Sequence, residues 1–384
     1  MGGRLTTNDG PKEISAYPPL MPEILLFGAT GYTGKLTAHA LARLGADFAI
    51  AGRNRAKLDA LAAATGGPEV RVAQVGDVDA LVHALEGVKV LITCVGPFGE
   101  LGRTAVEAAL RAKVHYIDST GEGPFIGQMI NTKSEQARNV GIAMTSAMGF
   151  DEVPADVAAT KSTEGMEQAE LILTYALPTQ ASTGTLRSLL GIVSSSGVWL
   201  ENGTPIEIKM GERQRWAPMP PPLGPRASLA FPLAEGRLAP LHLDLRSVST
   251  YVTVGPIEKI GMKTAAPLLP LLGNNTVKNL MEKVLARLPE GPNDLQRSKS
   301  HWTILAEARS GSRWRNVSIS GTDVYGLTAE FLSAGAMKIA ADGPEDTGVL
   351  APVQAVGLET FEKVFAEHGV DVKVYETTGG LGSR

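Results

Sequence analysis

The first part of the chain alternates short apolar runs with longer segments in which apolar residues recur at helical spacing. Short apolar runs bounded by turn residues are typical of parallel strands buried on both faces. They occur at Glu23–Phe27, Phe48–Ala51, Val70–Val75, Val88–Val95, Val114–Asp118 and Ile142–Thr145. The helical segments between them are Gly34–Leu44, Arg55–Ala64, Asp79–Leu85, Arg103–Ala112 and Pro124–Val140. The alternation predicts an α/β fold with a Rossmann-type doubly wound parallel sheet.

The pattern changes after a helix expected at Pro154–Thr163. Strand-like runs follow at Glu170–Ala176, Ser247–Val254, His301–Ala308 and Arg315–Ser320, the last two separated by a hairpin turn. The proline-rich stretch 216–225 does not suit a sheet interior, and it is interpreted as a surface loop or as a cover over a pocket. Helices are expected at Asn275–Leu288, Tyr325–Ala340 and Ala355–His368. We predict an arm at 1–22, a nucleotide domain at 23–155, a mixed α+β second domain at 156–325, and C-terminal helices at 326–384 that complete the first domain.

Composition narrows the possible function classes. The chain has 384 residues, enough for two domains, and its net charge of −4 provides no basic surface for nucleic acid. The single cysteine, Cys94, excludes a disulfide framework and a cysteine zinc cluster, and suits a reducing cytoplasm. The six histidines lack metal-ligand spacing, and no apolar run approaches the ~20 residues of a membrane helix. We therefore expect a cytoplasmic protein without a metal or a membrane-spanning segment.

A glycine motif follows the first predicted strand and opens the first helix. In Gly28-Ala-Thr30-Gly31-Tyr32-Thr33-Gly34, the first glycine permits a tight turn. The second lets the backbone approach a pyrophosphate, and the third allows close packing of helix on strand. The helix N-terminus then offers unpaired N–H groups to the phosphates. The motif predicts a dinucleotide site.

The end of the second strand indicates which nucleotide binds. Proteins that bind NAD place a carboxylate there for the ribose 2′-hydroxyl, whereas this chain has Gly52, Arg53, Asn54 and Arg55. A guanidinium can hold a 2′-phosphate that a carboxylate would repel. Arg53 is the predicted phosphate ligand beside Asn54, while Arg55 and Lys57 also fit a solvated helix face. The predicted cofactor is NADP(H).

Two further strand ends carry candidate site residues. Cys94, Val95, Gly96 and Pro97 are expected beside the nicotinamide ribose, with Cys94 more suited to packing than to nucleophilic chemistry. Phe98 and Phe150 are expected to line the substrate cleft. Tyr116 is the candidate for holding or protonating the substrate, with Asp118 orienting it or the ribose, and the alternative is that Tyr116 is a packed strand residue.

These motifs together resemble a known family, the saccharopine dehydrogenase-like reductases. The resemblance rests on Gly28–Gly34, Ala51–Arg53, Val95–Phe98, Tyr116–Glu122 and Gly149–Asp156. Within that family the chain is most similar to the trans-acting enoyl reductases, on Ala181–Arg187, Gly321–Ala329 and Gly348–Ala355. The similarity runs from about 23 to 366 and weakens at Gly149–Glu152 and Thr322–Val324. It implies an inserted mixed-sheet domain over the cofactor cleft, and it makes Arg187 a candidate substrate residue and Tyr325 a candidate catalytic residue of the pocket.

The expected activity is hydride transfer from NADPH to an activated double bond. The bond is C=C conjugated to a carbonyl, as the subgroup suggests, or C=N, as in the wider family. The apolar segment Ala265–Gly273 and the low charge favour an apolar, lipid-like or polyketide-like substrate, free or carrier-bound. One alternative is an NADP-sensing module without catalysis, and another is a scaffold in a biosynthetic assembly. A free sheet edge makes the second domain the expected surface of a homodimer.

Overall fold

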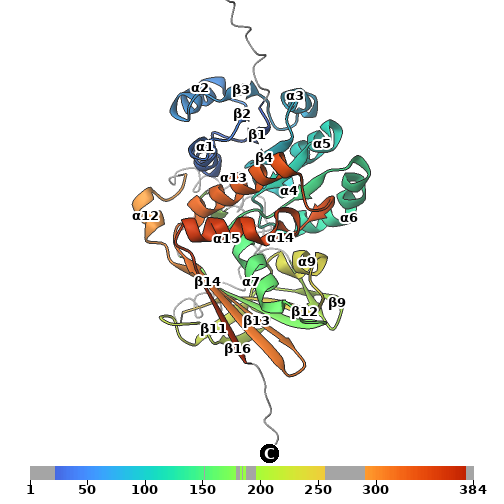
Figure 1. Ribbon diagram of the computed structural model, residues 1–384, viewed down its shortest axis with the longest axis vertical. Coiled ribbons are helices and arrows are strands. Elements are labelled where there is room, and N and C mark those ends of the chain that lie inside the picture. The colour runs from blue at the N-terminus through green and yellow to red at the C-terminus, as the bar shows by residue number, and fades with distance from the viewer. Residues whose placement is uncertain are drawn as a thin grey trace, which may run out of the picture.

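The computed structural model describes residues 22–150, 152–178, 182–183, 185–186, 196–255 and 290–377. A parallel sheet with helices on both faces forms one end of the molecule, and a second, mixed sheet forms the other (Figure 1). This confirms the predicted fold class. The predicted arm, apart from Pro22, lies outside the described residues, as do the helix Asn275–Leu288 and the apolar segment Ala265–Gly273.

The first sheet contains every strand predicted in the first part of the chain, and one more. Its order is β15-β6-β5-β4-β1-β2-β3, and all neighbours are parallel. The strands are β1 (Ile24–Phe27), β2 (Phe48–Gly52), β3 (Glu69–Val72), β4 (Val90–Thr93), β5 (His115–Asp118), β6 (Ala143–Thr145) and β15 (Gly348–Leu350). β15 escapes prediction because a three-residue strand carries almost no periodic signal.

Helices cover both faces of this sheet. One face is covered by α1 (Tyr32–Arg43), α2 (Arg55–Ala64) and α13 (Val324–Asp342), and α15 (Leu358–Glu367) packs on α13. The other is covered by α3 (Val78–Ala84), α4 (Phe98–Leu101), α5 (Arg103–Ala112) and α6 (Gly123–Val140). Strand β1 shows why both faces are needed, because Ile24 and Leu26 pack into the first cluster while Leu25 and Phe27 pack into the second.

The second sheet is mixed and has a branch. Its order is β10-β11-β12-β7-β13-β14-β16, with β8 and β9 attached to β12, and only β7 and β12 run parallel. Its strands are β7 (Ala169–Ala176), β8 (Gly197–Glu201), β9 (Thr204–Ile208), β10 (Gln214–Ala217), β11 (Arg226–Ala230), β12 (Leu245–Thr253), β13 (Trp302–Ser310), β14 (Arg313–Gly321) and β16 (Asp371–Thr377). Three short helices flank it: α9 (Glu235–Leu238), the 3₁₀ helix Ala239–Leu241 and α12 (Asp294–Ser298).

The two faces of the second sheet differ in what covers them. We call inner the face that packs against α7 (Val153–Thr163), which carries Leu173, Tyr175 and Ile304. On the outer face, the start of the proline-rich stretch lies over β13, where Ala217 and Met219 pack on Leu305. The proline-rich stretch therefore begins as the edge strand β10 and continues as a loop over the outer face, away from the first sheet.

The C-terminal part differs from the prediction of helices alone over 326–384. β15 adds a strand to the first sheet, and β16 pairs with β14 in the second. The helix expected at Ala355–His368 is divided into α14 (Pro352–Val356) and α15, because Gly357 adopts a φ of 88° that a right-handed helix cannot continue through. The C-terminal part thus belongs to both sheets.

The buried carboxylate of Asp156 on α7 links elements of the first sheet's domain with elements of the second. Asp156 accepts a hydrogen bond from the backbone N–H of Val353 at 2.8 Å and contacts Nε2 of His242 at 2.7 Å. Burial alone would lower the pKa of His242, but the Asp156 carboxylate outweighs it, so the pKa is raised above its ordinary value. These contacts join α7 to α14 of the first half and to the segment after α9.

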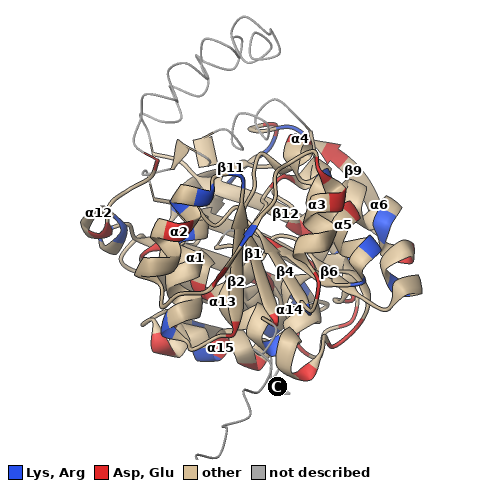
Figure 2. Cartoon of the chain, turned by 90° about the horizontal axis from the view of Figure 1, so that it is seen from above, with Lys and Arg blue, Asp and Glu red and all other residues tan. Residues whose placement is uncertain are grey.

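Charged residues are distributed over the whole described surface. Figure 2 shows Lys and Arg interspersed with Asp and Glu along the helices, with neither sign filling a face in that view. Among the described residues, no helix is long and apolar enough to cross a membrane, and no three His, Cys, Asp or Glu side chains are grouped as metal ligands.

Candidate functional site

The turn between β1 and α1 has space only for glycine at two positions. Gly28 adopts a φ of 81°, and a Cβ there would lie 2.6 Å from Cγ2 of Val95. A Cβ on Gly34 would lie 2.3 Å from the carbonyl oxygen of Gly28. The turn is therefore held against the loop after β4 and against the first turn of α1, as the dinucleotide motif predicts.

The start of α1 is open for a ligand. Gly31 is its exposed N-cap and provides no side-chain cap, and the first turn contains no acidic residue. Thr30 and Thr33 are half-buried, and the carbonyl oxygen of Thr33 accepts a hydrogen bond from Thr37 within the helix. The backbone N–H groups and the positive end of the helix dipole can thus face the phosphates of a dinucleotide.

Beyond β2, the basic residues have different environments. Arg53 is exposed, and no hydrogen bond or ion pair of its side chain occurs within the described part of the chain. Asn54 accepts from the backbone N–H of Lys57 and caps α2, and Arg55 pairs with Asp59 at 2.8 Å. Asn54, predicted to bind the cofactor, thus also has a structural role, while the Arg53 guanidinium is available for a phosphate.

The segment after β4 lies at the same carboxyl-terminal edge of the first sheet as the glycine loop and Arg53. Cys94, Val95 and Pro97 are half-buried and Gly96 is exposed. Burial raises the pKa of the Cys94 thiol to about 12, so this thiol stays protonated and is a poor nucleophile. Its role is to pack beneath the cofactor edge rather than to react.

Phe98 begins α4 and turns away from this edge into the core. Its side chain is buried, and its ring lies 6.0 Å from that of Phe125. The Glu122 carboxylate accepts from the backbone N–H groups of Phe98 and Gly99, each at 2.9 Å, and so caps α4. Sequence analysis placed Phe98 against the substrate, whereas the structure encloses its ring and places only its backbone at the loop.

Tyr116 and Asp118 form a buried hydrogen-bonded pair. The Tyr116 hydroxyl donates to Oδ2 of Asp118 at 2.7 Å, and neither residue has exposed surface. Asp118 also accepts from Ser146 Oγ at 2.9 Å, and from the backbone N–H groups of Thr120 at 2.9 Å and Ala147 at 3.1 Å. One carboxylate therefore holds the loops that follow β5 and β6. In this conformation Tyr116 is the packed strand residue of the alternative interpretation, because its hydroxyl and ring are both enclosed.

Burial also controls the charge of this pair. Desolvation raises the pKa of Asp118 to about 6, although all four hydrogen bonds oppose the shift. Burial and the neighbouring Asp118 raise the pKa of Tyr116 well above its ordinary value. Near neutral pH, Asp118 is thus an ion held by donors and Tyr116 remains a donor.

Phe150 follows β6 and connects the two halves. Its ring meets the Trp302 ring edge-on at 4.7 Å, and its backbone N–H donates to Oγ1 of Thr328 on α13 at 3.0 Å. It is 5% exposed. Phe150, which was expected to line the substrate cleft, therefore joins the first sheet, β13 and α13 at one point, with its ring enclosed.

Tyr325, in the first turn of α13, packs against the glycine loop. Its ring packs edge-on against that of Tyr32 at 5.2 Å, and its hydroxyl accepts from the backbone N–H of Ser182 at 2.5 Å. The same hydroxyl is 2.9 Å from Oγ1 of Thr185. Tyr32 in turn donates to the carbonyl oxygen of Pro292 at 2.5 Å. Sequence analysis predicted Tyr32 and Tyr325 for different ligands, and the structure brings them together; Arg187 lies outside the described residues.

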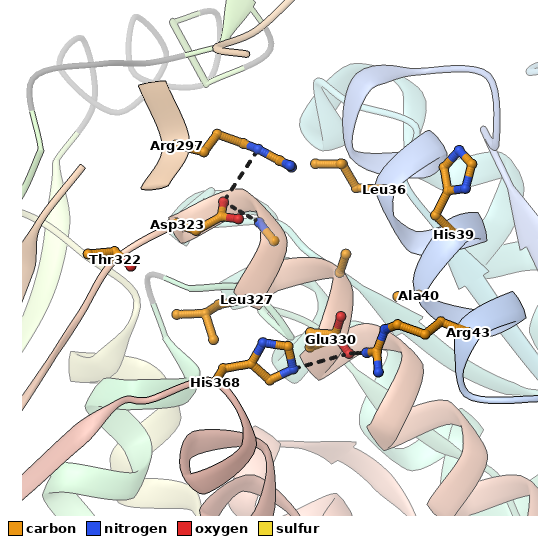
Figure 3. Close-up of a pocket in the computed structure, with 12 residues that line it drawn as sticks. Leu36, His39, Ala40, Arg43, Arg297, Thr322, Asp323, Leu327, Glu330 and His368 are labelled. Carbon is orange, nitrogen blue, oxygen red and sulfur yellow. Dashed lines mark hydrogen bonds and ion pairs between the residues drawn. The ribbon is translucent and has the colours of Figure 1, made fainter. Parts of the chain in front are cut away.

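A cavity of about 270 Å³ opens between α1 and α13, behind this contact. Figure 3 shows Glu330 between Arg43 and His368 on one side, and Asp323 beside Arg297 on the other. None of the predicted site residues lines it. Its charged groups pair across the walls and hold α1 to α13, so this cavity is separate from the predicted cofactor edge.

Comparison with known proteins supports the family resemblance. Residues 24–148 match the family described as the saccharopine dehydrogenase NADP binding domain. The protein is an NADP-dependent oxidoreductase. A trans-acting enoyl reductase of Mycobacterium ulcerans is 26% identical, with 87% of this chain and 93% of the relative covered. One of Mycobacterium tuberculosis is 24% identical with the same coverage. The resemblance predicted from the motifs is confirmed, and the cofactor is NADP(H).

The fold of this oxidoreductase also matches a solved structure. Apo saccharopine dehydrogenase (L-Glu forming) from Saccharomyces cerevisiae superposes with a TM-score of 0.62 at 14% identity. The match covers 92% of this chain and 99% of the other. Both the nucleotide domain and the second sheet therefore belong to the shared fold.

Charge reversal at Arg53 should weaken NADPH binding selectively. Charge-assisted hydrogen bonds contribute about 1.5–3 kcal/mol, so Arg53→Glu should raise the Kd for NADPH at least tenfold. NADH lacks the 2′-phosphate, and its Kd should change little. Fluorescence titration of both nucleotides measures this, with Lys57→Glu as a control that makes the same charge change on α2. An equal loss for NADH, or for the control, would contradict the assignment.

Replacing Asp118 by Asn should flatten the pH dependence of stability. The folded pKa of about 6 lies above the ordinary value of 3.8, so between these values only the folded chain retains the proton. The stability gained by this proton is fully present below the ordinary value and is lost as the pH rises through about 6. The wild-type free energy of unfolding should therefore fall by roughly 2 kcal/mol relative to Asp118→Asn between pH ~4 and ~7. Urea unfolding across this range tests it, and parallel curves would contradict it.

Proposed function

We propose that the protein reduces the C=C bond of an enoyl substrate with NADPH. The observation that carries the proposal is the contact between Tyr325 and Tyr32. It brings a phenolic hydroxyl from the second half of the chain onto the glycine loop of the NADP-binding domain. The relatives named trans-acting enoyl reductase, which align over most of this chain, support C=C as the reduced bond.

The residues near this contact favour an apolar acceptor. Ser182 and Thr185 bond to the Tyr325 hydroxyl, and Thr328, three residues further along α13, accepts from the backbone of Phe150, whose ring packs on Trp302. An amino dicarboxylate would require several converging arginines. Arg297 lies 2.9 Å from Asp294 and 3.6 Å from Asp323, although its buried Nε and Nη1 atoms make no hydrogen bond within the described part of the chain, and Lys35 at the start of α1 pairs with Glu290 at 2.9 Å.

The bound nicotinamide supplies a hydride to the enoyl carbon β to the carbonyl, and the residues must provide the proton for the α carbon. We assign that proton to the Tyr325 hydroxyl, which is the one predicted catalytic group with any exposed surface, at 8%. Tyr116 and Asp118 are fully buried and act by fixing the loops after β5 and β6. Arg187 and Phe98 remain predictions for the substrate.

Turnover tests the proposal directly. Purified protein with NADPH should lose nicotinamide absorbance when an enoyl thioester is added, free or carrier-bound, and much less with a cyclic imine. The absorbance change should be far smaller with NADH. Preference for the imine would replace C=C by C=N as the reduced bond. NADPH binding without transfer to either acceptor would instead support the NADP-sensing alternative.

Removal of the Tyr325 hydroxyl should slow the chemical step. General acid catalysis contributes about 10²–10⁴-fold, so Tyr325→Phe should lower kcat at least about a hundredfold while the Kd for NADPH stays the same. Tyr116→Phe is the matched control, because it removes a hydroxyl that is enclosed, and it should retain kcat within a few-fold. A Tyr325→Phe variant with wild-type kcat would remove the proton-donor assignment.

A further inference from the structure

A lysine, Lys35, stands in the part of α1 that faces the cofactor. It is the fourth residue of the helix, and its backbone N–H donates to the carbonyl oxygen of the N-cap, Gly31, at 2.9 Å. Side chains of an α-helix tilt toward its N-terminus, so each side chain covers the turn that precedes it. The turn that Lys35 covers is the one whose backbone N–H groups face the phosphates of the dinucleotide.

In this conformation the Lys35 ammonium pairs with a carboxylate from the second half of the chain. Its Nζ donates to Oε2 of Glu290 at 2.9 Å, and the two side chains are 47% and 63% exposed. An ion pair with this much exposure is screened by water and salt, and it contributes little stability. An anion that binds Lys35 more strongly can therefore displace the Glu290 carboxylate.

The backbone that carries Glu290 is held beside α1 by other contacts. Gly291 lies against the Tyr32 ring, where a Cβ would come within 2.6 Å of Cζ. The Tyr32 hydroxyl donates to the carbonyl oxygen of Pro292 at 2.5 Å. The carbonyl oxygen of Glu290 itself accepts from the backbone N–H of Thr183 at 3.2 Å. The Glu290 side chain can therefore turn away from Lys35 while its backbone stays in place.

The anion expected at this turn is the pyrophosphate of NADP(H), which carries two negative charges. Its oxygens attract an ammonium more strongly than one exposed carboxylate does, because they carry more charge and accept charge-assisted hydrogen bonds. Other arginines near α1 have different places. Arg43 lies at the opposite end of the helix, where it pairs with Glu330, and Arg53 follows β2, where the 2′-phosphate is expected. Lys35 is the cation that lies at the pyrophosphate turn.

We propose that Lys35 binds the pyrophosphate of NADP(H), and that it exchanges the carboxylate of Glu290 for the phosphates when the cofactor enters. Glu290 therefore competes with the cofactor for one ammonium group and lowers the affinity of the site. Because NADPH and NADH share the pyrophosphate, Lys35 contributes equally to both, whereas Arg53 distinguishes them. This exchange involves the cofactor alone and is the same whichever double bond is reduced.

Fluorescence titration of the protein with NADPH and with NADH tests the role of Lys35. Lys35→Met should raise the Kd of both nucleotides about tenfold, because a charge-assisted hydrogen bond is lost. Lys35→Arg keeps the charge and should stay within about threefold of the wild type. Lys89→Met is the matched control, because Lys89 forms a similarly exposed ion pair with Glu23, at 2.5 Å, at the opposite edge of the first sheet. It should change neither Kd, and a loss confined to NADPH, or no loss with Lys35→Met, would overturn the assignment.

The same titrations test the competition by Glu290. Glu290→Gln should lower the Kd of both nucleotides about two- to threefold, since the ammonium no longer has to leave a carboxylate. In the Lys35→Met protein the same change should have no effect, because no ammonium remains to compete for. Glu23→Gln is the matched control and should leave both Kd values unchanged. Equal tightening with and without Lys35 would mean that Glu290 acts by repulsion alone, and no tightening in the wild type would mean that it does not compete. Either result overturns the exchange.

Discussion

The packing of α13 against the first sheet is the constraint on which the site depends. The chain leaves this sheet at α7, builds most of the second sheet and returns through β14 directly into α13. From that one helix, Tyr325 reaches the glycine loop and Thr328 reaches the backbone of Phe150. Glu330, five residues after Tyr325, reaches Arg43 on α1 (Figure 3). A shift of α13 would therefore move the contacts to the glycine loop and to the second sheet together.

The start of α13 shows how this position is fixed. Asp323 adopts a φ of 52°, in the left-handed region, and its carboxylate accepts from the backbone N–H of Gly326 at 2.8 Å. A Cβ on Gly326 would lie 2.3 Å from that carboxylate, so only glycine leaves room for the cap. The Arg297 guanidinium also lies beside Asp323, and it belongs to α12, directly before β13. The helix thus starts at a defined residue, and Tyr325 follows within its first turn.

The features that could be predicted from the sequence are those that depend on residues close together in the chain. The strand–helix alternation, the glycines of the β1–α1 turn and the basic end of β2 each depend on residues within a few positions of one another. The environment of Tyr116 depends instead on Ser146 and Ala147, which only the pairing of β5 with β6 brings close. The strands β8 to β11 and β16 were missed because strands of mixed polarity resemble loops in the sequence, and their pairing is visible only in three dimensions.

The extent of the family match follows the same distinction between local motifs and contacts made by distant segments. The family match ends at residue 148, just before Phe150 and α7, where the local motifs of the nucleotide site end. Beyond it, side chains such as Trp302 on β13 and Tyr325 on α13 have neighbours that come from distant segments. The enoyl reductases of the two Mycobacterium species nevertheless align with 87% of this chain at 24–26% identity, so the similarity extends through both sheets.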